Sequence, residues 1–160
     1  MEARLRAFVR ENADCFRRSH LPGHVTGSAW IVDRSRTQTL LTYHGKLGRW
    51  LQLGGHWEEG EEILETALRE AREECGLLRI EPISEAIFDL DIHLIPAGKG
   101  VPDHLHYDVR FAFEANREDE LIASPESRQL AWVALDRVRE LNPDPCVARM
   151  VAKSATLGRL

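Results

Sequence analysis

Hydrophobic and polar residues alternate along two stretches of this chain, 88–94 and 105–113, and such alternation is typical of a half-buried β-strand. Residues 96–103 lie between the two stretches, which are therefore predicted to form an antiparallel hairpin. Further apolar runs that are bounded by turn-forming residues predict strands at 25–32, 39–43, 50–53, 78–83 and 130–134. The pattern therefore predicts a β-sheet at the centre of the fold.

Apolar positions at helical spacing predict helices in other parts of the chain. The first helix is expected over 3–18 and a second over 62–76, where Gly76 provides a typical end. Residues 135–141 and 145–157 predict a short helix and a closing helix. Strands mixed with helices in this way favour an α+β fold, in which helices cover both faces of a mixed sheet.

Three carboxylates stand out on the second predicted helix. Glu70, Glu73 and Glu74 lie at positions i, i+3 and i+4, which share one face of an α-helix. Like charges at this spacing repel one another, and a hard divalent cation such as Mg²⁺ or Mn²⁺ removes that repulsion because it binds carboxylate oxygens. Arg69 directly precedes them and can orient a carboxylate through its planar guanidinium group. A solvated charged helix is the simpler alternative.

A second polar group lies on one face of the predicted hairpin. If paired residue numbers sum to about 199, His93 lies opposite His106 and Asp91 opposite Asp108, and His104 shares their face. Imidazoles beside carboxylates bind a transition metal, or bind phosphate when they are protonated. The alternative is an ordinary solvated face of an antiparallel hairpin.

Composition narrows the class of protein. The chain has 160 residues, of which 43% are hydrophobic, so a single folded domain over 1–160 is expected. No apolar run is long enough to span a bilayer, and the N-terminus lacks a signal-peptide core, so no membrane partner is expected. The net charge of −5 argues against binding a nucleic acid duplex. Three widely separated cysteines fit reduced thiols in the cytoplasm.

The stretch 55–77 resembles the Nudix box, the signature of the Nudix hydrolase family. Its fixed positions are all filled, by Gly55, Glu61, Arg69, Glu70, Glu73, Glu74 and Gly76. Ala71 is a small departure at a variable aliphatic position, and Leu77 fills another. The resemblance implies an α/β/α sandwich with a central mixed sheet, and it covers about residues 24–141. Residues 1–20 are then an added N-terminal helical extension.

The resemblance also implies a reaction and a set of site residues. Family members use water to hydrolyse a nucleoside diphosphate linked to another moiety, so the expected substrate is a small nucleotide-type diphosphate. By motif position, Glu70, Glu73, Glu74 and the Gly55 carbonyl are expected to bind Mg²⁺ or Mn²⁺. Glu61 is expected to support this network with Arg69. Either Glu70 or a carboxylate of the 116–127 loop, for which Glu126 is favoured, is expected to act as the general base.

Substrate contacts are harder to assign, because packing explains many of the same residues. Candidates are His56 and Trp57 next to the glycine pair, and His93, His104 and His106 on the hairpin. Family members are often homodimers, which the resemblance therefore allows here. Two alternatives remain: a ligand-sensing Nudix module without turnover, and an enzyme similar to isopentenyl diphosphate isomerase. The isomerases use a catalytic cysteine where this chain has Gly54-Gly55-His56, which argues against the second.

Overall fold

The computed structural model describes residues 1–45, 47–98, 100–125 and 127–158. Within these ranges the helices are α1 (Glu2–Glu11), α2 (Ile63–Cys75), α3 (Val138–Leu141) and α4 (Pro145–Ser154). The strands are β1 (Gly23–Asp33), β2 (Gln38–His44), β3 (Arg49–Leu51), β4 (Leu53–His56), β5 (Ile80–Pro82), β6 (Asp89–Ile95), β7 (His104–Ala115) and β8 (Ser127–Ala134).

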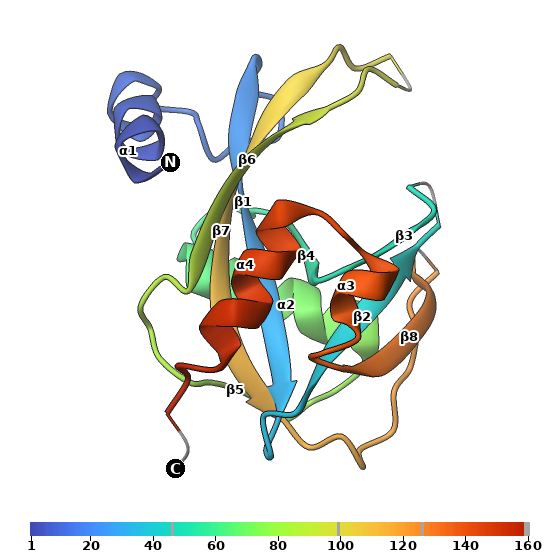
Figure 1. The fold of residues 1–160 in the computed structure, drawn as a ribbon. Coiled ribbons are helices and arrows are strands. Elements are labelled where there is room, and N and C mark those ends of the chain that lie inside the picture. The colour runs from blue at the N-terminus through green and yellow to red at the C-terminus, as the bar shows by residue number, and fades with distance from the viewer. Residues whose placement is uncertain (46, 99, 126, 159–160) are drawn as a thin grey trace.

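The strands form one mixed sheet with β1 at its centre (Figure 1). The main order is β3-β2-β1-β7-β5, while β4 pairs with β1, β6 with β7 and β8 with β2. The long central pair, β1 and β7, is parallel, and the other strand pairs are antiparallel. Both types of pairing occur, which confirms the predicted mixed sheet.

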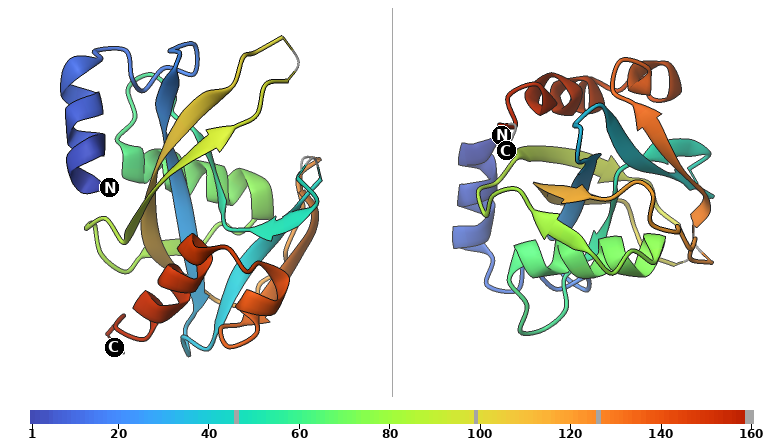
Figure 2. Two further views of the ribbon diagram at one scale, coloured as in Figure 1. Left: turned by 45° about the horizontal axis from the view of Figure 1, so that its top comes forward. Right: turned by 90° about the horizontal axis from the view of Figure 1, so that it is seen from below.

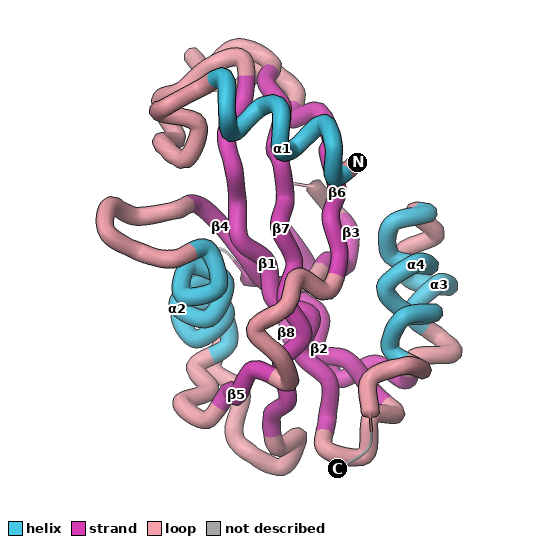
Figure 3. The backbone as a smooth tube through the Cα atoms, turned by 90° about the vertical axis from the view of Figure 1, so that its left-hand side faces the viewer, coloured by secondary structure: helices cyan, strands magenta, loops and turns pink. Residues whose placement is uncertain are grey.

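Helices cover both faces of this sheet. Figure 3 and the right-hand view of Figure 2 show α2 on one face and α3 with α4 on the other. Strand β1 is buried along its whole length, as expected for a strand with helices on both sides. One apolar core packs between the sheet and α2, and a second packs under α3 and α4 around Trp30, whose indole N–H donates to Ser154 Oγ at 2.8 Å. The α/β/α sandwich is confirmed.

The hairpin of β6 and β7 has the predicted register. His93 pairs with His106 and Asp91 with Asp108, as the sum of 199 requires. The strands extend to Ile95 and back from His104, and successive side chains of each strand point to opposite faces of the sheet. The hairpin therefore confirms which of its residues share a face.

The N-terminal extension is less helical than predicted. A helix over 3–18 was expected, but α1 ends at Glu11, and residues 13–19 form turns and a bend. Phe8 fixes α1 to the sheet, because its ring stacks on Tyr107 with centroids 3.8 Å apart and the rings nearly parallel. Phe16, at the end of the expected helical stripe, packs instead against Trp57, with centroids 5.8 Å apart. Tertiary contacts of these two rings thus override the continuous helical pattern.

In place of the one strand expected at 50–53 the structure has two, β3 and β4, which pair with β2 and β1. The other boundaries differ from the expectation by a few residues at the ends of elements. The closing helix α4 ends at Ser154 rather than 157, and β5 covers three residues rather than 78–83. Among the described residues, none of the helices combines the length and the apolar composition that a membrane span requires.

Candidate active site

The carboxylate helix α2 is fixed at both ends by local signals. At its start, Glu62 and Glu65 form a reciprocal capping box, and Glu62 N donates to Glu65 Oε2 at 2.8 Å. At its end, Gly76 has φ of 73° and its N–H donates to the Arg72 carbonyl at 2.8 Å. The helix turns Thr66, Ala67, Ala71 and Cys75 into the core. Its orientation about its own axis is therefore set by burial, and this places Glu70 at the edge next to β4.

Arg69 links three segments of the site. Its Nε donates to Glu61 Oε1 at 2.7 Å, and Nη1 donates to Glu70 Oε1 at 3.1 Å. Nη2 donates to the His56 carbonyl at 2.8 Å, so the same guanidinium also holds the end of β4. The side chains of Arg69 and its two carboxylate partners are each about one-fifth exposed. Solvent therefore screens the attraction between these charges only partly. The predicted pairing of Arg69 with Glu61 is present in the structure.

Gly55 and Glu70 touch across the gap between β4 and α2. A Cβ on Gly55 would lie 2.4 Å from Glu70 Cδ and 2.5 Å from Glu70 Oε1. No side chain larger than hydrogen fits there without displacing the carboxylate. The sequence predicts a close backbone approach at Gly55, and the structure brings that backbone against Glu70.

Glu73 and Glu74 extend this carboxylate group along α2. Glu73 is the more exposed, and its Oε2 lies 3.5 Å from Arg69 Nη1. Glu74 Oε2 accepts the Gly54 backbone N–H at 3.1 Å, so two of the three helix carboxylates contact the glycine pair of β4. The loop that follows β7 also reaches this helix, because Ile122 N and Ser124 N donate to the carbonyls of Cys75 and Glu74.

Burial and Arg69 shift the pKa values of the two carboxylates in opposite directions. The hydrogen bond from Arg69 lowers the pKa of Glu61, which also accepts from Thr66 Oγ1 at 2.8 Å. Burial raises the pKa of Glu70, although the Arg69 charge opposes that rise. The two carboxylates that share one arginine therefore have distinct proton affinities.

The donor set fits a hard divalent cation. Glu70, Glu73 and Glu74 present carboxylate oxygens, and the backbone of Gly55 lies against Glu70. Carboxylate and backbone carbonyl oxygens are the ligands that Mg²⁺ and Mn²⁺ prefer. The missing Cβ at Gly55 leaves room for Glu70 beside that backbone. These residues could therefore hold such an ion.

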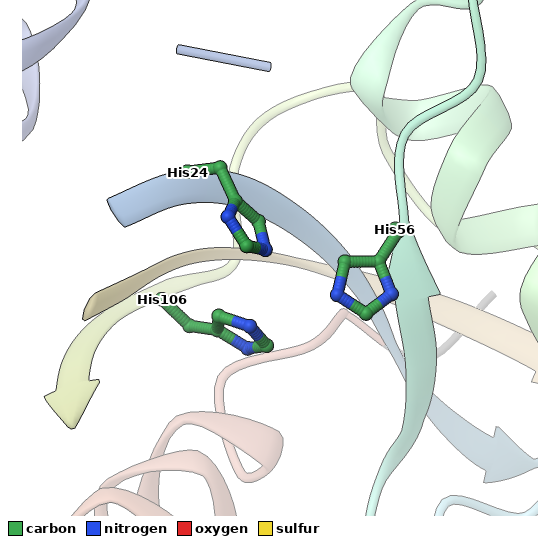
Figure 4. A group of neighbouring side chains, drawn as sticks. All are labelled: His24, His56 and His106. Carbon is green, nitrogen blue, oxygen red and sulfur yellow. The ribbon is translucent and has the colours of Figure 1, made fainter. Parts of the chain in front are cut away.

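Histidines gather on the other face of β4. His24 of β1, His56 of β4 and His106 of β7 bring their ring nitrogens within 4.8 Å of one another (Figure 4). Burial lowers the pKa of His56 to about 4 and that of His106 to about 2, and it lowers the pKa of His24. His104 stacks on His24 at 5.1 Å, and the His93 ring lies 5.6 Å from that of His106.

The predicted hairpin face is not a solvated surface. Asp108 and Arg110 are 3% and 2% exposed, and Arg110 Nε donates to Asp108 Oδ2 at 2.7 Å. Asp108 also accepts from the hydroxyls of Thr26 and Ser28 at 3.0 and 2.7 Å. Helix α4 covers the far end of this face, where Arg149 and Lys153 donate to Asp89. The alternative of an ordinary solvated hairpin face is therefore wrong. Alternation within a hairpin does not reveal that a helix from another part of the chain covers one of its faces.

The other predicted residues have mixed surroundings. The side chain of His93 is 39% exposed, and its Nδ1 lies 3.2 Å from Asp91 Oδ2. His104 Nδ1 donates to the Pro102 carbonyl at 2.9 Å. Trp57 donates its indole N–H to the Glu61 carbonyl at 2.7 Å, which is a loop-packing contact inside the site. Glu126, the favoured loop carboxylate, lies outside the described residues.

Sequence reasoning missed His24. Its strand has a polar face of His24, Thr26 and Ser28 that alternates with apolar residues, so a signal was present. The pairing of β1 with β7 places His24 beside His106, and it is this long-range contact that makes His24 part of the histidine cluster.

A groove of about 820 Å³ lies elsewhere, between α1 and the start of β6, and none of the candidate residues lines it.

Two comparisons with known sequences match most of this chain. A family model described as NUDIX domain matches residues 23–152. The m7GpppN-mRNA hydrolase NUDT17 of Xenopus laevis is 31% identical over 121 residues, with 69% of this chain and 40% of that protein covered. The chain therefore spans about two-fifths of the length of this curated relative.

Solved structures share the fold. The Ap4A hydrolase of C. elegans, in a binary complex, superposes with a TM-score of 0.67 at 17% identity, over 82% of this chain and 95% of that one. A hydrolase of the NUDIX family from Clostridium perfringens gives 0.61 at 23% identity, over 84% and 98% of the two chains. At these identities the likeness establishes the fold alone.

Proposed function

We propose that this chain, which belongs to the NUDIX domain family, is a divalent-metal-dependent pyrophosphohydrolase. Its substrate is a small molecule in which a nucleoside diphosphate is linked to another moiety, and the diphosphate linkage is cleaved. One observation carries the proposal: Arg69 holds Glu61, Glu70 and the His56 carbonyl together, with Glu70 packed against Gly55. The box residues thus converge in space as a working site requires.

Each residue of the site has a distinct task in this reaction. Glu70, Glu73, Glu74 and the Gly55 carbonyl would hold Mg²⁺ or Mn²⁺. When bound there, the cation neutralises charge on the diphosphate oxygens and on the developing transition state. Arg69 keeps Glu70 at one orientation, and Glu61 keeps Arg69 in place through two hydrogen bonds. A preorganised carboxylate costs no rearrangement when the reaction begins.

The chemical step needs a base and a leaving group. Water oxygen forms a bond to one phosphorus, its proton passes to a carboxylate, and the bond from that phosphorus to the bridging oxygen breaks. Glu70 is one candidate for the base. A carboxylate of the loop that contacts the end of α2 is the other, and Glu126 is our choice within it. His56 and Trp57 next to the glycine pair, and the hairpin histidines His93, His104 and His106, are the candidate substrate contacts.

A substrate panel tests this proposal directly. Purified protein is incubated with nucleoside triphosphates, nucleotide sugars, a dinucleoside tetraphosphate and capped RNA, with Mg²⁺ or Mn²⁺, and phosphate release is scored with and without added pyrophosphatase. The last two compounds are included because the relatives' names refer to Ap4A and to m7GpppN-mRNA. Turnover that stops with EDTA and returns with metal is expected. Saturable binding without turnover would instead indicate a sensing module.

The proposal also covers the cellular location and the oligomeric state of the protein. We place the protein in the cytoplasm, because Cys15, Cys75 and Cys146 are free thiols in the structure. Burial raises the pKa of Cys15 and raises that of Cys75 to about 11, which keeps both thiols protonated and unreactive. A homodimer is the assembly we would test first, by light scattering at several protein concentrations.

A further inference from the structure

We propose that His24, His56 and His106 form a second metal site, which binds a transition-metal ion of the zinc class through three imidazole nitrogens. This site is separate from the carboxylate group of α2. The inference rests on the positions and contacts of these side chains, and it does not depend on the proposed hydrolase activity.

The sheet itself brings the three histidines together. His24 and His106 are direct partners in the parallel pairing of β1 with β7. His56 pairs with Thr26, two residues from His24 on the same face of β1. The ring centroid of His24 lies 5.2 Å from that of His56 and 4.8 Å from that of His106. The centroids of His56 and His106 are 5.3 Å apart. Three neighbouring strands of the sheet thus bring the three rings close to one another (Figure 4).

The three rings are near enough to share one ion. One nitrogen from each ring lies within 4.8 Å of the other two. Zinc–nitrogen bonds of about 2.0–2.1 Å in a tetrahedral site place ligand nitrogens roughly 3.3 Å apart. A bound ion would therefore draw the three nitrogens together through rotation of the rings about their side-chain bonds.

Two of the rings have buried nitrogens without partners. His24 is 1% exposed, and Nε2 of both His24 and His106 is buried without a hydrogen bond to any described residue. A buried polar atom without a hydrogen bond destabilises a fold, and here two such atoms lie on adjacent strands. A shared metal ion satisfies both nitrogens at once. His24 and His106 are direct partners on neighbouring strands, and their ring centroids lie 4.8 Å apart.

A backbone contact of His24 favours the tautomer that a metal ligand needs. Its Nδ1 lies 3.4 Å from the His20 carbonyl, which can only accept, so this contact favours a proton on Nδ1. In that tautomer Nε2 carries the lone pair that would bind a metal ion. A backbone carbonyl that holds the second nitrogen of a metal-binding histidine is a common outer-shell arrangement. The turn that supplies this carbonyl is itself fixed, because His20 Nδ1 donates to the Gly23 carbonyl at 2.6 Å.

Three protein ligands leave a fourth coordination position open. That position suits water or another oxygen ligand. The site also adjoins the carboxylate group, since His56 follows Gly55 and its carbonyl accepts from Arg69 Nη2 at 2.8 Å. An ion on the His56 ring would therefore hold the same residue whose backbone positions Arg69.

Cobalt provides the test, because Co²⁺ in a tetrahedral nitrogen site has strong visible absorption. Untagged protein in excess Mg²⁺, which occupies the carboxylate site, is titrated with Co²⁺ and then with Zn²⁺. We expect one Co²⁺ per chain, displaced by Zn²⁺, and a higher melting temperature with Zn²⁺. His24→Gln and His106→Gln should weaken binding more than about 100-fold, since losing a ligand costs more than losing an outer-shell partner.

Matched variants separate this site from others. His44→Gln, on β2 and outside the cluster, should bind like the wild type, and so should a protein with both Glu73→Gln and Glu74→Gln. Circular dichroism checks folding, and His56→Gln, at a less buried position, gives the answer if His24→Gln does not fold. A wild type without the tetrahedral spectrum, or histidine variants that retain full affinity, would overturn the proposal. Stabilisation by inorganic phosphate instead of Co²⁺ would overturn it as well.

Discussion

Glu70 and Gly55 are in van der Waals contact, and a Cβ at Gly55 would lie 2.4 Å from the Glu70 carboxyl carbon. The contact joins β4 to α2 at the point where the metal is expected, and the Glu70 carboxylate leaves no room for a Cβ at residue 55.

Gly55→Ala should lower kcat strongly with a smaller effect on stability. The added methyl group displaces the Glu70 carboxylate, and a misplacement of about 1 Å can cost on the order of 100-fold in rate. The measurement is kcat at saturating Mg²⁺ beside the melting temperature. Gly98→Ala is the matched control, because its Cβ meets no atom within 4 Å. Equal kcat in the two variants would contradict the proposed role of this contact.

Glu73→Gln and Glu74→Gln should each reduce kcat by roughly 10²–10⁴-fold. Both substitutions keep the shape of the side chain but remove a charge that would hold the cation. Stability in EDTA should stay constant or rise slightly, since repulsion among Glu70, Glu73 and Glu74 is relieved. Glu81→Gln on the short strand β5, an exposed position, is the control. Wild-type rates in both variants at saturating metal would show that the ligand assignment is wrong.

Arg69→Lys should be far from conservative. A lysine keeps the charge, but it cannot hold Glu61, Glu70 and the His56 carbonyl in one fixed geometry. We expect kcat to fall at least tenfold and the free energy of unfolding to fall by about 1–3 kcal/mol, because partly buried acceptors lose their donor. Arg72→Lys, on an exposed part of the same helix, should change neither. If Arg69→Lys and Arg72→Lys have the same kcat and the same free energy of unfolding, the linkage through Arg69 is needed neither for catalysis nor for stability.

Acid should destabilise the protein through Asp89. Burial raises the pKa of this carboxyl, but hydrogen bonds from Arg149 and Lys153 outweigh burial, and the folded pKa is lowered. A depressed folded pKa adds stability above the unfolded value of about 3.9, and this contribution is lost as the pH falls through the folded pKa. Urea unfolding of the wild type at about pH 7 and about pH 3 should therefore show a marked loss.

Asp89→Asn removes the charge and isolates this effect. It should cost about 3–5 kcal/mol at neutral pH, because Arg110, Arg149 and Lys153 lose their buried partner. Its stability should then fall less between the two pH values than that of the wild type. Asp136→Asn at an exposed position should follow the wild type. An unchanged pH dependence in Asp89→Asn would rule out this carboxyl as the acid-sensitive group.

The sequence by itself determined the features that depend on local periodicity. The alternation of 88–94 and 105–113 determined which hairpin residues share a face, and helical spacing ended by Gly76 determined α2 and its row of glutamates. The resemblance to the Nudix box implied the pairing of Arg69 with Glu61, and the structure contains that hydrogen bond.

Only the tertiary structure decided how distant segments combine. The parallel pairing of β1 with β7 joins residues 82 positions apart, such as His24 and His106, and no local pattern encodes it. That pairing added His24 to the histidine cluster, and the packing of α4 buried Arg110 on a face that alternation alone left open to solvent. Local patterns specify which side of a strand a residue occupies, whereas long-range packing decides what covers that side.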